Sequence, residues 1–337
     1  MKKILSAILV ATALMGCNKE NTLDSLEQPK IGFGYVFVNN TTKATATATD
    51  LSTANLTEFS VFGALTVNSS TGKIFENDRV YKNASNVFVY DNTQYWIPNT
   101  QYHFTAIAPY QTGNAAAWTY TTSEAQNGTI TYDASSDIDL LFAYVKPAKT
   151  AATITTQPEK VGFTFNHLLS RARFTFVNNV PEISNITFKI TDVKILDAYK
   201  VGTIAVSNGV AGNWAAETNN NTYDVSFANA ATIIPGEADN VTNYESTEHH
   251  YILPVAKTLN VSFKLEIFQA GVSLGTYDRA TTVDITPGKG MSYDIKANLT
   301  VKNALPNAIY PIEFKVNAIN DWAGYTDVNA GNIVTNN

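Results

Sequence analysis

Residues 31–38 read Ile-Gly-Phe-Gly-Tyr-Val-Phe-Val, a run in which every second side chain is large and apolar. A β-strand places alternate side chains on one face, so this run predicts a strand with one apolar face. The side chains assigned to that face are Ile31, Phe33, Tyr35 and Phe37.

Similar runs follow along the chain, separated by clusters of Asn, Gly, Ser, Thr and Pro that are typical of turns. No segment shows helical periodicity for more than two turns. Many short strands with turn signals predict an all-β protein built from antiparallel sandwiches. The clearest further runs cover residues 59–62, 87–90, 102–107, 163–165, 173–177, 261–268 and 312–316.

The chain has 337 residues, a formal net charge of −6 and only 15% charged residues. It is apolar enough to form cores, which excludes wholesale disorder. It has no basic stripe, which argues against nucleic acid as a partner. The length predicts about two domains. Residues 146–153 are poor in large apolar side chains, so we divide the chain near this loop, into domains of residues 31–165 and 166–337.

The first residues form a targeting segment. Lys2 and Lys3 precede an apolar stretch, and Leu-Met-Gly-Cys at 14–17 resembles the lipobox of bacterial lipoproteins. Residues 1–16 are therefore predicted to be a signal peptide, Cys17 the lipidated residue and residues 17–30 a tether. Acyl chains on Cys17 would hold the protein on a membrane. The alternative is a plain secretory signal with a chance cysteine.

Three patterns could carry chemistry, and each has a plainer explanation. Ser273 lies in a G-x-S-x-G motif, but between strand-like runs, which predicts a hairpin turn and not a nucleophile elbow. His249 and His250 are adjacent, so in a strand they point to opposite faces and do not readily share a metal ion. Asp133, Asp137 and Asp139 lack the spacing of a calcium loop and are predicted to form a solvated acidic loop. We expect no catalytic residues, no cofactor and no metal.

The tryptophans leave two possibilities open. They could be platforms for sugar rings, or they could be packed in the sandwich cores, because each aromatic side chain buries a large area. The four residues are Trp96, Trp118, Trp214 and Trp322.

Several segments together resemble the fimbrillin family, the subunits of type V pili in Bacteroidetes. The most specific is Phe-Thr-Phe-Asn-His-Leu-Leu-Ser-Arg-Ala-Arg-Phe at 163–174, in which we expect His167 to be a hydrogen-bonded packing residue. The other matching segments are Tyr-Trp-Ile-Pro at 95–98, Tyr-His-Phe-Thr-Ala at 102–106, Ala-Pro at 108–109, Asp-Leu-Leu-Phe-Ala at 139–143, Tyr-Ile-Leu-Pro at 251–254, and Pro-Gly-Lys at 287–289 with Tyr293.

The resemblance implies two transthyretin-like antiparallel β-sandwich domains in tandem and a structural, adhesive role without enzymatic activity. In polymerising members a protease removes the first strand, and a strand from a neighbouring subunit fills the groove. Here the removable strand would be the run with Ile31, Phe33, Tyr35 and Phe37. Polymerising subunits are usually cut after an arginine, but Lys43, followed by Ala44, is the basic residue available in the right segment.

The role within a pilus stays open. Residues 312–318, with Ile312, Phe314, Val316 and Ala318 on one face, could be a donor strand or the last strand of the second domain. The second alternative leaves a short polar tail and favours a tip or accessory subunit over a stalk subunit. Expected partners are other pilus subunits, outer-membrane lipid through Cys17, and surface ligands of host or bacterial cells, at the outer membrane and cell surface. The rival hypothesis is a surface glycan-binding lipoprotein that uses the tryptophans.

Overall fold

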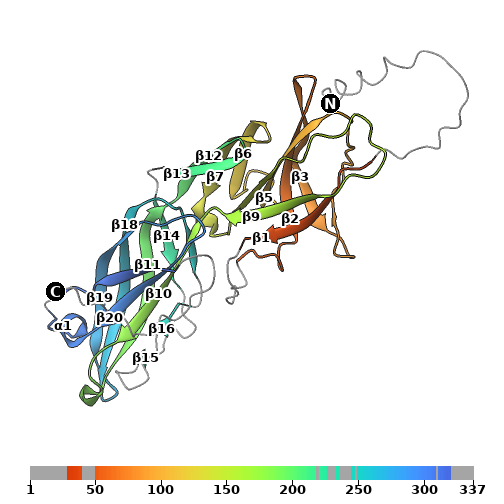
Figure 1. Ribbon diagram of the computed structural model, residues 1–337. Helices are drawn as coiled ribbons and strands as arrows, with labels where there is room; N and C mark the ends of the chain where they lie inside the picture. The colour runs from red at the N-terminus through yellow and green to blue at the C-terminus, as the bar shows by residue number, and fades with distance from the viewer. Residues whose placement is uncertain are drawn as a thin grey trace, which may run out of the picture.

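The computed structural model describes residues 29–39, 50–217, 220–225, 233–234, 244–246, 249–308 and 310–319. They form an elongated molecule made almost entirely of β-strands, which confirms the predicted all-β class (Figure 1). The helical turns among them are short: η1 (Ala134–Ser136), η2 (Glu182–Ser184) and α1 (Val301–Ala304). No helix in these ranges is long and apolar enough to cross a membrane.

A seven-stranded sheet forms the N-terminal end of the molecule, with strand order β1-β9-β8-β5-β2-β3-β4. Its inner face covers an aromatic core that includes Phe59, Phe104 and Phe163. The ladder of β1 with β9 is parallel, whereas the other ladders of this sheet are antiparallel. The strands are β1 (Phe33–Val38), β2 (Glu58–Val67), β3 (Ser70–Lys82), β4 (Phe88–Val89), β5 (Gln101–Ala108), β8 (Leu141–Val145) and β9 (Val161–His167).

A four-stranded sheet lies at the middle of the molecule, with strand order β13-β12-β7-β6. Because β12 pairs with β7, this sheet combines strands from both sides of the predicted boundary at residues 165 and 166. The division into two tandem domains therefore stays a prediction. The strands are β6 (Trp118–Glu124), β7 (Asn127–Asp133), β12 (Val201–Ser207) and β13 (Val210–Ala216).

Two further sheets pack face to face at the C-terminal end, around a core that contains Phe174, Phe188 and Phe263. One sheet has the order β16-β10-β20-β21, with β17 also on β10, and its β10–β20 ladder is parallel. Its strands are β10 (Ser170–Asn178), β16 (Tyr244–Glu245), β17 (His250–Ile252), β20 (Ser292–Leu299) and β21 (Phe314–Ile319).

The second of these sheets has the order β14-β11-β18-β19, with β15 also on β11. In β18 every second side chain from Leu259 to Ile267 is buried, as the period of two requires. Ala270 and Gly271, both at positive φ, form the two-residue turn into β19. The strands are β11 (Ile186–Tyr199), β14 (Asn220–Asp224), β15 (Ile233–Ile234), β18 (Lys257–Gln269) and β19 (Val272–Ile285).

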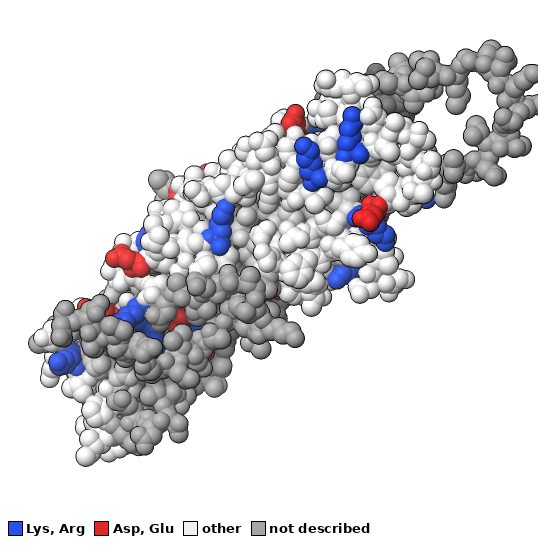
Figure 2. All heavy atoms as spheres, viewed as in Figure 1, with Lys and Arg blue, Asp and Glu red and all other residues white. Residues whose placement is uncertain are grey.

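Charged side chains are few and scattered on the face of the molecule shown in Figure 2, in keeping with the low charged fraction of the chain. Three clusters of buried apolar side chains form the cores of the protein, one at each end of the molecule and one at its middle.

Candidate functional site

The first strand, β1, is the edge strand of the seven-stranded sheet; it lies between β9 and the segment at Gln94, and we call the place that it fills the groove. On one side it pairs with β9, and the Asn39 amide extends this ladder by donating to the Phe165 carbonyl at 2.8 Å. On the other side the Ile31 amide donates to the Gln94 carbonyl at 2.9 Å, just before β1 begins. Backbone hydrogen bonds thus hold this segment to β9 along the strand and to Gln94 just before the strand begins.

Phe33 is the main apolar contact of β1. Its side chain is 1% exposed, and its ring lies 5.4–6.1 Å from four other aromatic rings. Such edge-to-face and offset pairs stabilise beyond the area that they bury. These four rings, which we call the aromatic cage, belong to Phe75, Tyr90, Phe104 and Phe163.

The prediction that Ile31, Phe33, Tyr35 and Phe37 share one face is wrong for the last two. Ile31 and Phe33 are buried, but Tyr35 is 88% exposed and Phe37 is 51% exposed. Tyr35 has a φ of 49°, and the register with β9 shifts between Phe33 and Val36. This bulge adds one residue to β1 and reverses the faces beyond it. Val36 and Val38 point into the core in their place.

On the C-terminal side of residues 40–49, the chain is fixed by a buried polar cluster around Asp50. The Asp50 carboxylate forms an ion pair with Arg171, and both side chains are buried. His249 Nε2 lies 2.9 Å from Asp50 Oδ1, and the Tyr251 hydroxyl donates to the same oxygen at 2.9 Å. Arg171 also donates to Ser292 Oγ at 2.7 Å. We call these residues the Asp50 cluster.

The environment of Asp50 favours its charged form. Burial alone would raise the pKa of its carboxyl, but the hydrogen bond and charge of His249, the charge of Arg171 and the hydrogen bond from Tyr251 together hold this pKa well below its usual range. The sequence analysis missed this cluster, because Arg171 is 121 residues away and nothing local in the sequence marks the pair.

Two further contacts between a carboxylate and a histidine join residues on the two sides of the predicted domain boundary. Asp139 accepts from the Leu51 amide at 3.0 Å and contacts His167 Nδ1 at 3.0 Å, which confirms His167 as a hydrogen-bonded packing residue. Asp137 contacts His250 Nδ1 at 2.6 Å. The prediction of a solvated acidic loop is therefore wrong for Asp139, which is buried, whereas Asp137 is partly exposed and Asp133 accepts hydrogen bonds from its near neighbour Ser135. No group of three potential metal ligands occurs among the described residues.

The last described strand, β21, pairs antiparallel with β20, with Ala297 opposite Phe314. Ile312 is buried just before it. Phe314 is partly buried and lies 5.7 Å, ring centroid to centroid, from both Phe174 and Phe176. The face with Ile312, Phe314 and Val316 therefore packs on the C-terminal core. The fourth residue assigned to this face, Ala318, also lies within β21.

Comparison with known proteins identifies the family. The sequence model of the fimbrillin-like family matches residues 42–322, most of the chain. This chain belongs to the fimbrillin-like family. A search of curated proteins found no match.

Two solved structures similar to this fimbrillin-like chain come from species of Bacteroides. A fimbrial protein from Bacteroides vulgatus is 18% identical with a TM-score of 0.59, and the alignment covers 87% of this chain and 99% of that chain. A proposed cell adhesion protein from Bacteroides uniformis is 15% identical with a TM-score of 0.48, covering 88% and 98% of the two chains. The first of these supports the all-β fold of the fimbrillin-like chain.

Some predicted site residues of this fimbrillin-like chain fall outside the described residues. They are Cys17, Lys43, Ala44 and Trp322. Lipidation of Cys17 and cleavage after Lys43 therefore stay predictions.

The three described tryptophans are not exposed platforms. Trp96, Trp118 and Trp214 are 5%, 3% and 7% exposed, so a sugar ring cannot stack on them. Trp118 Nε1 donates to the Pro109 carbonyl at 3.0 Å, and Trp214 Nε1 donates to the Leu168 carbonyl at 2.7 Å. These residues do not support the glycan-binding rival.

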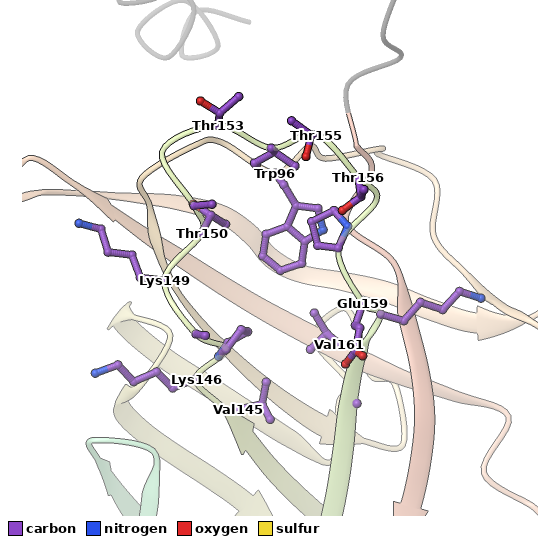
Figure 3. Close-up of a pocket in the computed structure, with 17 residues that line it drawn as sticks. Trp96, Val145, Lys146, Lys149, Thr150, Thr153, Thr155, Thr156, Glu159 and Val161 are labelled. Atoms are coloured by element: carbon purple, nitrogen blue, oxygen red, sulfur yellow. The ribbon is translucent and has the colours of Figure 1, made fainter.

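A cavity of about 590 Å³ opens above Trp96, under the loop that joins β8 to β9. Figure 3 shows the indole within this loop, while Lys146 and Lys149 extend from the rim away from the cavity. The charges of these two lysines therefore do not converge on a ligand position.

The G-x-S-x-G motif lies in the β18–β19 hairpin, as predicted. Ser273 Oγ donates to Glu266 Oε1 at 2.9 Å on the exposed side of the hairpin. A nucleophile elbow requires a strand followed by a helix, so this serine has no elbow geometry.

Proposed function

We propose that this protein is an adhesive, non-enzymatic pilus subunit of the fimbrillin type. It is exported as a lipoprotein through Cys17 to the outer membrane and assembles with other subunits by β-strand addition. Support comes from the family match over residues 42–322, the all-β fold and the lipobox-like sequence before Cys17.

One observation carries the proposal: different contacts hold the chain on the two sides of residues 40–49. Before this segment, β1 lies in its groove, and after it, Asp50 is fixed in its cluster. A cut after Lys43 would leave residues 44–49 ahead of the Asp50 cluster and separate β1 from the rest of the chain. The retained chain would keep its fold, and only the groove would change its occupant.

Cleavage of the chain is required before another strand can replace β1. While β1 is joined to the chain, its apolar burial keeps it in the groove. Complete burial of Ile31, Phe33 and Val38 contributes roughly 5–9 kcal/mol in total. An empty groove would expose apolar surface and an unpaired edge of β9, which is a template for aggregation. A subunit whose groove is filled until assembly avoids this hazard.

The position of the subunit in the pilus would depend on what β21 does. A subunit that keeps β21 on β20 would be a tip or accessory subunit, whereas one that gives β21 to a neighbour would be a stalk subunit. In each case the exposed surface would meet ligands on host or bacterial cells.

The proposal is tested by shearing fibres from cells that carry the wild-type protein or Lys43→Gln. We expect the wild-type protein in the fibre fraction as detergent-resistant multimers and Lys43→Gln in the membrane fraction. The matched control is Lys73→Gln, an exposed lysine on β3, which should behave as wild type. Recovery of the wild-type protein only as a monomer in the periplasmic leaflet would refute the function.

A further inference from the structure

The loop between β8 and β9, residues 146–160, contacts the segment that leads into β1. The Gln157 side chain donates through Nε2 to the Lys30 carbonyl at 2.6 Å and accepts from the Lys30 amide through Oε1 at 3.2 Å. A side-chain amide thus satisfies both backbone groups of Lys30, as a neighbouring strand would do.

Lys160 continues this contact along the chain. A side chain at Gly32 would place its Cβ 3.2 Å from Lys160 Cγ, and one at Gly34 would place it 3.0 Å from Lys160 Cδ. The two glycines therefore let the alkyl stem of Lys160 lie directly on the backbone, on the face opposite the Phe33 ring. We call residues 157–160 the strap.

The other end of the loop is fixed to a different segment. The Thr150 hydroxyl accepts from the Thr100 amide at 2.7 Å and donates to the Ile97 carbonyl at 2.6 Å. The Asn99 amide donates to the Ala151 carbonyl at 2.9 Å. These contacts involve no residue of β1. The loop therefore has one end that keeps its partners when β1 leaves and one end, the strap, that loses them.

Between these two ends, the loop surrounds an indole whose N–H has no acceptor (Figure 3). Trp96 Nε1 is buried and forms no hydrogen bond among the described residues, whereas the other two described indoles each donate to a carbonyl. The cavity of about 590 Å³ lies beside it. A buried donor without a partner raises the free energy of the closed loop, and water that enters on opening would satisfy it. The contacts of the strap therefore oppose a local tendency to open.

We propose that the β8–β9 loop is a latch on β1: the strap keeps the start of β1 in the groove after the chain is cut, and β1 leaves only when the loop opens. The cut after Lys43 lies beyond the other end of β1, so it breaks no contact of the strap. Cleavage and release are therefore separate steps. The release step rests on the proposed function, whereas the coupling between the loop and β1 does not.

The strap covers only the first half of β1. Beyond the bulge, the side chains of Tyr35 and Phe37 are exposed on the outer face. After the cut, this half should fray first and the strapped half should leave last. A cut subunit whose latch is closed keeps its groove filled, so the edge of β9 stays paired between cleavage and assembly.

The first test measures hydrogen exchange in the uncut full chain by NMR. Gln157→Ala removes both hydrogen bonds to Lys30, so it should speed exchange of the Trp96 indole N–H and the Ile31 amide by about ten-fold each. The Asn39 amide, at the other end of β1, should change by less than about two-fold. Acceleration at Trp96 alone, equal acceleration at Ile31 and Asn39, or no acceleration would overturn the coupling.

Matched variants test which atoms of the strap act. Thr156→Ala removes an exposed side chain next to Gln157 and should leave the exchange rates unchanged. Lys160→Met keeps an alkyl stem on the two glycines and should behave as the wild type, whereas Lys160→Ala should speed exchange of the Ile31 amide. Equal effects of the two changes at Lys160 would contradict the packing of its stem on β1.

The second test follows the release of β1 itself. A site for a sequence-specific protease is placed at residues 40–43 of the full chain, and the fragment that contains β1 is followed after cleavage by size-exclusion chromatography and mass spectrometry. The wild-type fragment should elute with the rest of the chain. The double variant Gln157→Ala/Lys160→Ala should release it at least about ten-fold faster, and Thr156→Ala should not. Equal release rates from all three proteins would overturn the latch.

The outcomes separate the latch from the proposed function. If fibres form but the strap variants release β1 no faster than the wild type, the latch fails and the function stands. If no fibres form in cells, the proposed function fails, and exchange in the uncut chain still decides whether the loop and β1 open together.

Discussion

The two sides of residues 40–49 are held in opposite ways. On the N-terminal side, apolar burial holds β1, with Phe33 among four aromatic rings. On the C-terminal side, Asp50 is held by directed polar contacts with Arg171, His249 and Tyr251. Apolar burial is non-directional and accepts another strand with similar side chains, whereas a buried ion pair accepts only its own partner. In the proposed function, the side held by apolar burial is the one that is replaced, and the side held by the ion pair stays.

The largest effect is expected where apolar burial holds β1. Phe33→Ala should destabilise β1 in its groove by about 3–5 kcal/mol, because a buried phenyl ring is lost and a cavity remains. Hydrogen exchange of the Ile31 and Asn39 amides, which both donate to backbone carbonyls, would measure this loss. Phe37→Ala is the control, with an expected change within about 0.5 kcal/mol, since this ring is half exposed. Equal effects of the two changes would contradict the assignment of faces.

The next largest effect is expected in the Asp50 cluster. Asp50→Asn should destabilise the fold by about 3 kcal/mol, because Arg171 keeps a buried charge without its anionic partner. Urea unfolding of the full chain measures this change. Asp192→Asn, which removes an exposed partner of Lys264, should leave the urea midpoint almost unchanged. A small effect at Asp50 would mean that the cluster does not anchor the chain.

Acid should selectively weaken the Asp50 cluster. Since the pKa of Asp50 is lowered by folding, its stabilisation is complete above the ordinary value of 3.8 and is lost as the pH falls towards the lower folded value. Between pH 5 and pH 2 the wild-type protein should lose on the order of 1–2 kcal/mol more than Asp50→Asn. Urea midpoints across this range provide the comparison, and parallel curves for the two proteins would argue against a charged Asp50 in the fold.

Apolar alternation in the sequence predicted the strands well but not the faces of β1. The period of two located β1, β18 and β21, because alternation is a local property of an amphipathic strand. A single left-handed residue at Tyr35 reverses the faces, and an apolar aromatic residue gives no sign of such a backbone. The side chains that fill the groove after Phe33 were therefore assigned wrongly.

The polar contacts at the middle of the molecule could not be predicted for a different reason. Asp137 and Asp139 look like surface residues in sequence, because carboxylates are rarely buried without partners. Their partners His250 and His167 lie 113 and 28 residues away. The family resemblance located His167, but only the folded chain brings the carboxylates to the histidines.

The smallest effect is expected at the bulge in β1. Tyr35→Asn should stabilise β1 by about 0.5 kcal/mol, because asparagine tolerates a left-handed backbone better than tyrosine and the exposed ring contributes little burial. Hydrogen exchange of the Asn39 amide would detect the change. Destabilisation by more than about 1 kcal/mol would show that the Tyr35 ring makes contacts that hold β1.

Removal of β1 is tested most directly by the N-terminal sequence of the protein in sheared fibres, determined by mass spectrometry. The fibre protein should begin at Ala44, without the residues of β1 and with Asp50 retained. A fibre protein that still begins at a lipidated Cys17 and contains residues 31–38 would contradict removal of β1 and assembly through its groove.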